Sequence, residues 1–136
     1  NRSIDENQLG EGEIKQKIKP IVGCVFYVCE DHLNKNYRDN GYHVVFLAKN
    51  KNGYNNLAKL SSIAYTKGFY YVPRIDKTLV EKYKDDIIVL TGNLMGEVSN
   101  KILNIGQKKA EEALLWWKKI FKDDLYIEIM RHNQED

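Results

Sequence analysis

Residues 42–76 constrain the fold most, because they contain a strand, a turn and a helix in immediate succession. Residues 44–48 form an unbroken apolar run, and a run without polar alternation is typical of a strand that is covered on both faces. The polar segment Lys-Asn-Lys-Asn-Gly follows and predicts a turn. Beyond it, Leu57, Leu60 and Ala64 recur at helical spacing, and Gly68 marks the end of the helix. An aromatic loop is expected between this helix and residue 76.

The remaining segments extend this alternation of strands and helices. Strands are predicted at residues 21–28, 87–90 and 125–130, which are rich in β-branched and aromatic residues. Helices are predicted at residues 77–83, 96–104 and 107–121, where apolar residues recur on one face. Asp76 is placed to cap the first of these helices, and Thr78 with Glu81 offers a capping box as an alternative.

Two of these helices carry specific packing expectations. In the helix at residues 96–104, Val98, Ile102 and Leu103 are expected to face inward. In the longest helix, apolar positions recur at steps of four, three and four and predict a wide buried stripe. Its main positions are Ala110, Leu114, Trp117 and Phe121. The paired tryptophans of this helix are therefore interpreted as core residues rather than as residues that stack on a ligand.

Length and charge indicate a single domain without an obvious charged partner. A chain of 136 residues is long enough for one hydrophobic core. Residues 1–19 are interpreted as a polar surface segment and residues 20–136 as the α/β domain. The 21 basic and 19 acidic residues leave a net charge of +2, which is too balanced to favour nucleic-acid binding by the isolated chain. Without a long apolar run or a leader, a cytoplasmic protein is expected.

The two cysteines are not expected to form a disulfide. Cys24 and Cys29 lie five positions apart on one predicted strand, so their side chains point to opposite faces of the sheet. Two free, buried thiols are expected instead. Without further cysteines, a thiolate metal site is not predicted.

The order of strands and helices favours parallel strands joined by crossover connections. An open α/β sheet and a segment of a β/α barrel both satisfy this order. Sequence spacing alone does not separate these two architectures.

Several long strings, found in order between residues 19 and 136, closely resemble one protein family. They are LAKN, KNGYNNLAKLSSIAYT, GFYYVPRID, IIVLTGNLMGE and EEALLWW. They resemble the alpha subunits of bacterial DNA polymerase III, and more narrowly part of the amino-terminal "polymerase and histidinol phosphatase" (PHP) domain of these subunits. The resemblance implies a segment of a distorted, incomplete β/α (TIM-like) barrel with mostly parallel strands. Functional residues would then lie at the carboxyl ends of the strands.

The resemblance also implies which residues would bind metal in a catalytically competent relative. Such relatives build a metal cluster from histidines, acidic residues and sometimes a cysteine. His43 matches a ligand histidine of the family, but Val25 stands where many relatives have a glutamate and Asn93 stands where others have a cysteine. The family's His-x-His and Asp-x-His motifs are also absent. We therefore expect no cofactor for this chain and a divalent metal only in the parent polymerase, with His43 interpreted as a hydrogen-bonded residue.

Other polar residues are weaker candidates for a site. Arg74 and Asp76 are close enough to form a charged pair, but Asp76 is equally suited to cap a helix while Arg74 holds the loop through charge-assisted hydrogen bonds. Arg131 and His132 follow the last predicted strand and are better placed for function than His32, which lies in a charged loop. Residues 92–97 contain two glycines but lack the Lys-Ser/Thr ending of a phosphate-binding loop.

Two hypotheses from different classes follow from these residues and from the resemblance. In the first, the chain is part of a replicative polymerase subunit and acts as a scaffold and interaction surface without catalysis of its own. Its implied partners are other polymerase subunits, including a proofreading exonuclease, and DNA through the rest of the parent protein. In the second, it belongs to a metal-dependent phosphoesterase or nuclease of the same superfamily. Val25 and Asn93 favour the first hypothesis. No membrane partner is expected, and we expect the chain to self-associate through its strand edges rather than to shield them with residues 1–19.

Overall fold

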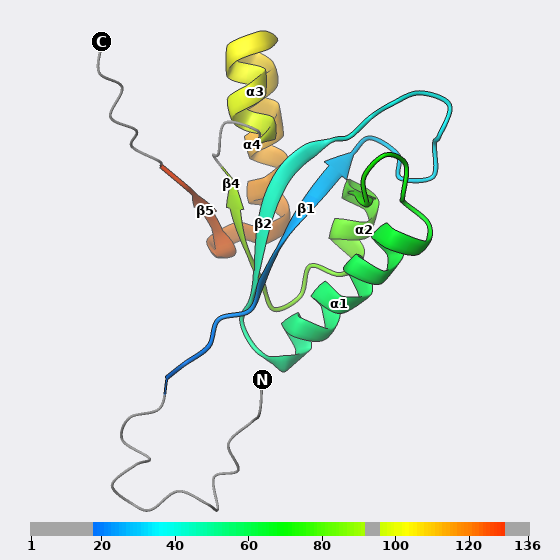
Figure 1. The fold of residues 1–136 in the computed structure, drawn as a ribbon. Coiled ribbons are helices and arrows are strands. Elements are labelled where there is room, and N and C mark those ends of the chain that lie inside the picture. Colours follow the sequence, from blue (N-terminus) through cyan, green and yellow to red (C-terminus); the bar gives the residue numbers. More distant parts are fainter. Residues whose placement is uncertain (1–17, 92–95, 130–136) are drawn as a thin grey trace, which may run out of the picture.

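The structure is a computed structural model in which residues 18–91 and 96–129 are described. These residues form a five-stranded sheet with helices packed against it (Figure 1). The polar segment predicted at residues 1–19 lies almost wholly outside the described residues. In the described part of the chain, no helix has the length and hydrophobicity that crossing a bilayer requires.

The sheet is mixed rather than mostly parallel. Its strand order is β3-β1-β2-β4-β5. The strands are β1 (Gly23–Cys29), β2 (Tyr42–Ala48), β3 (Arg74–Asp76), β4 (Ile87–Thr91) and β5 (Leu125–Ile127). The pairs β1 with β3 and β4 with β5 are parallel, whereas β2 is antiparallel to both of its neighbours. The prediction of mostly parallel strands is therefore wrong at β2, and the described strands form an open α/β sheet with β3 and β5 at its edges.

The direction of β2 follows from the connection that precedes it. Residues 30–41 contain turns and bends but no helix, so the chain leaves β1 and returns beside it in the opposite direction. By contrast, two helices lie between β4 and β5 and carry the chain back so that these neighbours run parallel. The expectation of a parallel crossover holds for β4 and β5, which are connected through helices, and fails for β1 and β2, which are connected by a loop.

The helices begin and end close to the predicted positions. They are α1 (Lys51–Thr66), α2 (Lys77–Lys82), α3 (Glu97–Asn104) and α4 (Gln107–Phe121). The side chain of Asn50 caps α1 by accepting a hydrogen bond from the Gly53 amide at 3.1 Å. A Cβ atom at Gly53 would lie 2.1 Å from the carbonyl oxygen of Asp86. Glycine is therefore required where α1 approaches the start of β4.

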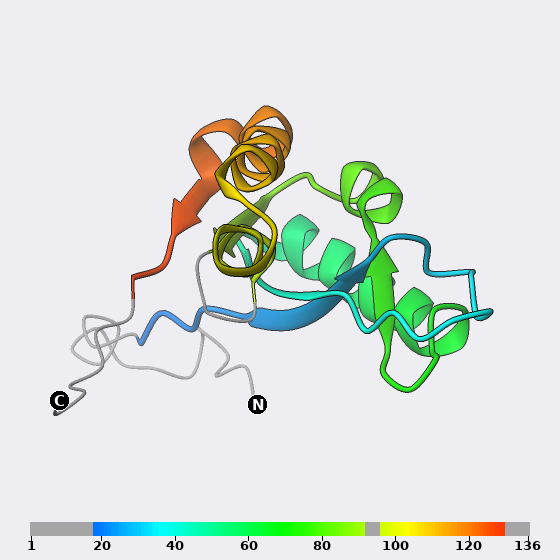
Figure 2. The same ribbon diagram turned by 90° about the horizontal axis from the view of Figure 1, so that it is seen from above.

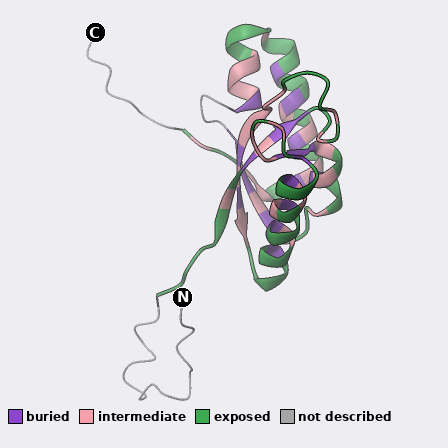
Figure 3. Ribbon diagram, turned by 45° about the vertical axis from the view of Figure 1, so that its right-hand side comes forward, coloured by how far each residue is buried: buried purple, intermediate pink, exposed green. Residues whose placement is uncertain are grey.

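One face of the sheet packs against helices and forms the core. Figure 2 shows the helices gathered on one side of the strands, and Figure 3 shows the buried residues concentrated where helices and strands meet. The strand residues of this face meet Leu57 and Leu60 of α1 and Trp117 and Phe121 of α4. These buried strand residues are Phe26, Val28, Val44, Phe46, Ile87 and Val89. The prediction that Trp117 belongs to the core is confirmed, since its side chain is 1% exposed.

The opposite face of the sheet carries apolar side chains that remain partly exposed. We call this surface the open sheet face; it consists of Val25, Val45, Leu47, Ile88 and Leu90. Val25 is 52% exposed and the other four are half-buried. The expectation that β2 and β4 are covered on both faces is therefore wrong for the described residues, because their helices pack on one side only.

Two local predictions differ from the structure. In α3, Ile102 is 57% and Leu103 is 71% exposed, so the predicted inward face of this helix is wrong. The helix packs on α4 through its other side. Residues 74–76, expected to be loop, form β3, because their backbone pairs with residues 27–29 of β1. Cys24 and Cys29 are free and lie on opposite faces of β1, as expected, although only Cys29 is fully buried.

A buried carboxylate links three of the helices. Glu97 of α3 is 6% exposed. Its Oε1 accepts hydrogen bonds from Lys77 of α2 at 3.0 Å and Lys101 of α3 at 2.7 Å, and its Oε2 accepts one from Trp117 of α4 at 3.0 Å. Burial alone would raise the pKa of Glu97, but the hydrogen bonds from Lys101, Lys77 and Trp117 outweigh it and lower the pKa. Glu97 is therefore ionised at neutral pH and neutralises part of the charge of both lysines.

We expect the isolated chain to self-associate through the open sheet face, because uncovered apolar side chains and free strand edges favour association. Light scattering behind a sizing column should show a mass that rises with concentration across a dilution series. Val25→Lys should shift the distribution toward monomer, because it places a charge on that face. Leu33→Lys, an equally exposed apolar position in the loop, should not. A concentration-independent monomer would contradict this account of the sheet.

Candidate functional site

Arg74, at the start of β3, holds the loop of residues 30–41 against the sheet. The side chain is fully buried, and all of its hydrogen-bond acceptors are backbone carbonyl oxygens. Its Nε donates to Gly68 at 2.9 Å and its Nη1 to Asp39 at 3.0 Å. Its Nη2 donates to His32 and Asn34, each at 3.1 Å. A guanidinium has five N–H donors in a fixed plane, so this one side chain fixes three points of the loop.

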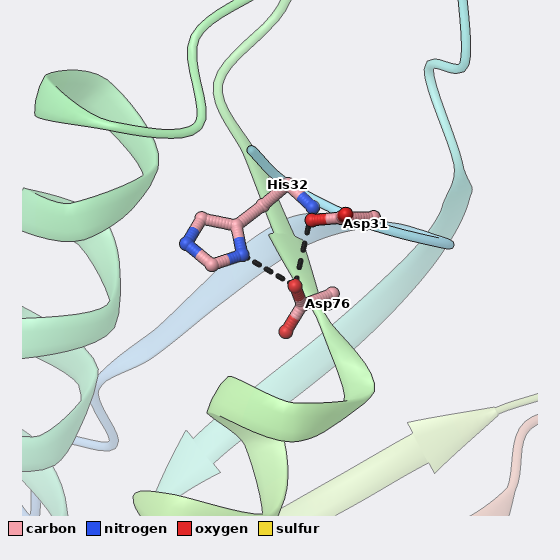
Figure 4. A group of neighbouring side chains, drawn as sticks. All are labelled: Asp31, His32 and Asp76. Atoms are coloured by element: carbon pink, nitrogen blue, oxygen red, sulfur yellow. Dashed lines mark hydrogen bonds and ion pairs between the residues drawn. The ribbon is translucent and has the colours of Figure 1, made fainter. Parts of the chain in front are cut away.

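Asp76, at the end of β3, makes the second attachment of the same loop. Its Oδ1 accepts from the Leu79 amide at 3.0 Å and so caps α2, as the sequence predicted. Its Oδ2 accepts from the His32 amide at 3.1 Å and also contacts the His32 ring at Nδ1. Figure 4 shows the His32 ring pointing toward the Asp76 carboxylate, with Asp31 beside them. Arg74 and Asp76 therefore both bind the loop.

The environment keeps Asp76 ionised and the neighbouring thiol protonated. Burial alone would raise the pKa of Asp76, but hydrogen bonds from the His32 side chain and from the Leu79 and His32 amides lower it below its ordinary value. At Cys29, burial raises the pKa to about 11, an effect that the nearby Arg74 charge only partly offsets. A thiol with this pKa is not a nucleophile at neutral pH.

Asp31, His32 and Asp76 are the one group of three potential metal ligands that the described residues bring together. Their ligand atoms lie within 4.8 Å of one another. Each acidic residue already has a structural partner, because Asp31 accepts from the Leu33 amide at 2.9 Å and Asp76 caps α2 and binds His32. The hydrogen bonds of the loop therefore account for this cluster without a metal ion.

The family positions for metal that the structure describes lie on one sheet face but supply a single potential ligand. His43 lies on β2 opposite Tyr27 of β1, and the two rings meet edge to face with centroids 4.5 Å apart. Val25 lies on the same sheet face with an aliphatic side chain, which cannot ligate a metal. His43 belongs to no group of three potential ligands in residues 18–91 and 96–129. The described residues thus do not fit a family metal cluster. Asn93, Arg131 and His132 lie outside the described residues.

Sequence reasoning did not identify the partners of His32. It lies in a loop of charged and polar residues that has no local pattern, and its partner Asp76 is 44 positions away. The sequence signal for these contacts is the string Pro73-Arg74-Ile75-Asp76. A buried arginine and a capping aspartate on one short strand require polar partners, and these are provided by Gly68 and by the loop before β2.

We expect Arg74→Met to lower the free energy of unfolding by at least about 3 kcal/mol, because it leaves several buried carbonyl groups without a donor. Urea unfolding followed by circular dichroism measures the change. Arg38→Met is the matched control, since Arg38 lies in the same loop and its side chain rests on the Tyr71 ring at 4.6 Å. Its effect should stay within about 1 kcal/mol. Equal effects of the two substitutions would show that Arg74 does not hold the loop.

A second expectation concerns pH. The folded state lowers the pKa of Asp76, so the stability that its charge contributes is present above the unfolded pKa of about 3.9 and is lost as the pH falls through the folded pKa. Asp76→Asn keeps a capping oxygen but removes the charge. The variant should be less stable than the parent at pH 7, and the difference should shrink below about pH 4. Urea unfolding at several pH values measures this, with Asp123→Asn, an exposed aspartate, as control. A difference that is independent of pH would contradict it.

The chain is similar to known proteins of one family. The model of the PHP domain family matches residues 7–132. The chain is similar to the DNA polymerase III subunit alpha of Borreliella burgdorferi, with 40% identity over 126 residues, and of Campylobacter jejuni, with 43% identity over 132 residues. These matches cover 90% and 89% of this chain but only 11% of each relative. The subunit of Aquifex aeolicus is 43% identical over 126 residues, or 85% of this chain.

The chain thus spans about a tenth of the length of these curated relatives. The family match extends over nearly all of its residues and includes both β3 and the loop that β3 holds. The chain belongs to the PHP domain family.

Proposed function

We propose that this chain is the PHP-domain part of a DNA polymerase III alpha subunit, where it acts as a scaffold and interaction surface without catalysis of its own. The observation that supports the lack of catalysis is the packing of His43, whose ring contacts Tyr27 and which belongs to no group of three potential metal ligands among the described residues. Phosphoryl and nucleotidyl transfer need metal ions held by several carboxylates or imidazoles around the substrate. Val25 supplies an aliphatic group where such a ligand would be needed.

The exposed apolar side of the sheet supports the role of an interaction surface. The open sheet face presents apolar side chains, and such a surface on a folded domain indicates contact with another protein segment. The partners that fit this role are the other segments of the polymerase subunit, further replicative subunits and a proofreading exonuclease. DNA would be contacted by the rest of the parent protein. This role places the chain in the cytoplasm, where replication occurs in bacteria.

We expect the purified chain to contain no stoichiometric zinc, manganese or iron at neutral pH, because Val25 and Asn93 replace two of the family ligands. Elemental analysis of protein purified without chelators measures the metal content. Two variants separate the possible sites. His43→Ala removes the family histidine, and His32→Ala removes the histidine of the loop cluster.

Near-integer metal content that disappears in His43→Ala would restore the family metal site and contradict the proposal. Metal content lost only in His32→Ala would assign a metal to the loop cluster and contradict the expected absence of metal. In the same preparation, primer extension and hydrolysis of a chromogenic phosphoester should both give no signal. Turnover that is proportional to protein concentration and abolished by EDTA would favour the alternative, a metal-dependent phosphoesterase or nuclease.

A further inference from the structure

A cavity of about 840 Å³ lies at the end of the sheet where β1 ends and β2 begins, between the loop of residues 30–41 and the helices. Its walls come from residues 37–42, from the first residue of α2, and from α3 and the first turn of α4. No residue of the open sheet face lines it, and neither His32 nor Asp76 does. Its volume lies within the range of about 300–1,000 Å³ that small-molecule sites occupy.

The cavity is lined by cations that come from separate elements. They are Arg38 of the loop, Lys77 of α2, Lys101 of α3 and Lys109 of α4. The Nζ atoms of Lys77 and Lys101 share one acceptor, the Oε1 atom of Glu97. Since each ammonium has three N–H donors, two donors of each lysine remain for other acceptors after this contact. The buried carboxylate therefore positions two ammonium groups side by side at the cavity wall.

The carboxylates in the wall do not cancel this charge. Asp39 accepts backbone N–H groups of Glu30 and Gly41, each at 2.9 Å. Both oxygens of Glu97 are engaged by Lys77, Lys101 and Trp117. Glu30 is exposed, and the cations outnumber the carboxylates four to three. The two lysines bring one more charge than Glu97 neutralises.

We propose that this cavity binds a small phosphate-bearing molecule, whose phosphate group is held by Lys77 and Lys101. Lysine ammonium groups bind phosphate as point charges, and two of them fixed by a buried carboxylate lose little freedom when a ligand binds. Lys109 lies at the rim, where its ammonium group forms an exposed ion pair with Glu112 at 3.5 Å and keeps donors for a further acceptor. Tyr37, Tyr42 and Ile105 also line the cavity and offer aromatic and apolar surface to the rest of the molecule.

The chain carries its own probe for this site. Its two tryptophans both contact the charged cluster, since the Lys77 Nζ lies 4.8 Å from the Trp116 ring centre and Trp117 donates to Glu97. Titration of the full 136-residue chain with ADP should change the tryptophan emission in a saturable way, and calorimetry should give the same affinity. Orthophosphate should compete with ADP, adenosine should not bind, and the affinity should fall as salt rises.

Adjacent lysines on α4 provide a matched pair of variants. Lys109 lines the cavity and Lys108 does not, although both are exposed in the first turn of the helix. Lys109→Gln should weaken ADP binding about fivefold, the effect of losing one partly exposed charge contact, and Lys108→Gln should leave it unchanged. A triple variant, Lys77→Gln with Lys101→Gln and Glu97→Gln, removes both anchors without leaving a buried charge. It should retain its circular dichroism spectrum and lose saturable binding.

Several results would overturn the proposal. The first is a tryptophan emission that shows no saturable change up to roughly 10 mM ADP. The others are an equal loss of ADP affinity in Lys108→Gln and Lys109→Gln, and binding of adenosine as tightly as ADP. If the triple variant unfolds, the comparison of Lys108→Gln with Lys109→Gln still tests whether ADP binds in this cavity. Tighter binding of a short single-stranded oligonucleotide than of ADP would assign these cations to a nucleic-acid backbone and would also overturn it.

Discussion

The buried guanidinium of Arg74 is the constraint on which the arrangement of this sheet depends. Arginine is charged at every accessible pH, and burying a charge is costly unless all of its donors are satisfied. Here the acceptors are carbonyl oxygens at the end of α1 and in the loop between β1 and β2. The loop must therefore lie over β3, and its position brings β2 back beside β1 with the reversed direction.

The buried carboxylate of Glu97 holds the helices together, as the buried guanidinium of Arg74 holds the loop. It is buried between α2, α3 and α4, and each of these helices donates to it. A carboxylate whose donors include two ammonium groups remains ionised. The result is a fixed positive cluster beside a cavity, whereas Arg74 uses all of its contacts to hold backbone. One buried charge thus closes a loop, and the other holds charges at a surface that a ligand can reach.

The sequence was sufficient for the local elements and insufficient for their directions. The helix Gln107–Phe121 is found at the predicted residues because its apolar stripe is long and regular. Asp76 caps α2 because its position just before an apolar-periodic segment specifies this role. The antiparallel direction of β2 follows from the helix-free connection before it, but the contacts of Arg74 that hold this connection in place join residues 35 to 42 positions apart.

The candidate sites show the same division. The resemblance named His43, Val25 and Asn93, and the described residues leave His43 without other ligands. His32 was passed over because its partner is far along the chain. The outward face of α3 was also mispredicted, because a short helix with apolar residues on two sides does not reveal which side packs on the neighbouring helix. Long-range pairing decides these points, and periodicity carries no information about it.

The two surfaces proposed for function share no residue, although both are built on the same sheet. The open sheet face is formed by residues of β1, β2 and β4 whose neighbours in sequence point into the core. The cavity lies at the end of the sheet, between the helices and the loop, and Val28 and Cys29 line it from the two faces of β1. Its charged residues Lys77 and Lys101 belong to helices rather than to strands. A protein segment that covers the open sheet face would therefore add a second layer to the sheet and leave the charged cavity accessible to a small ligand.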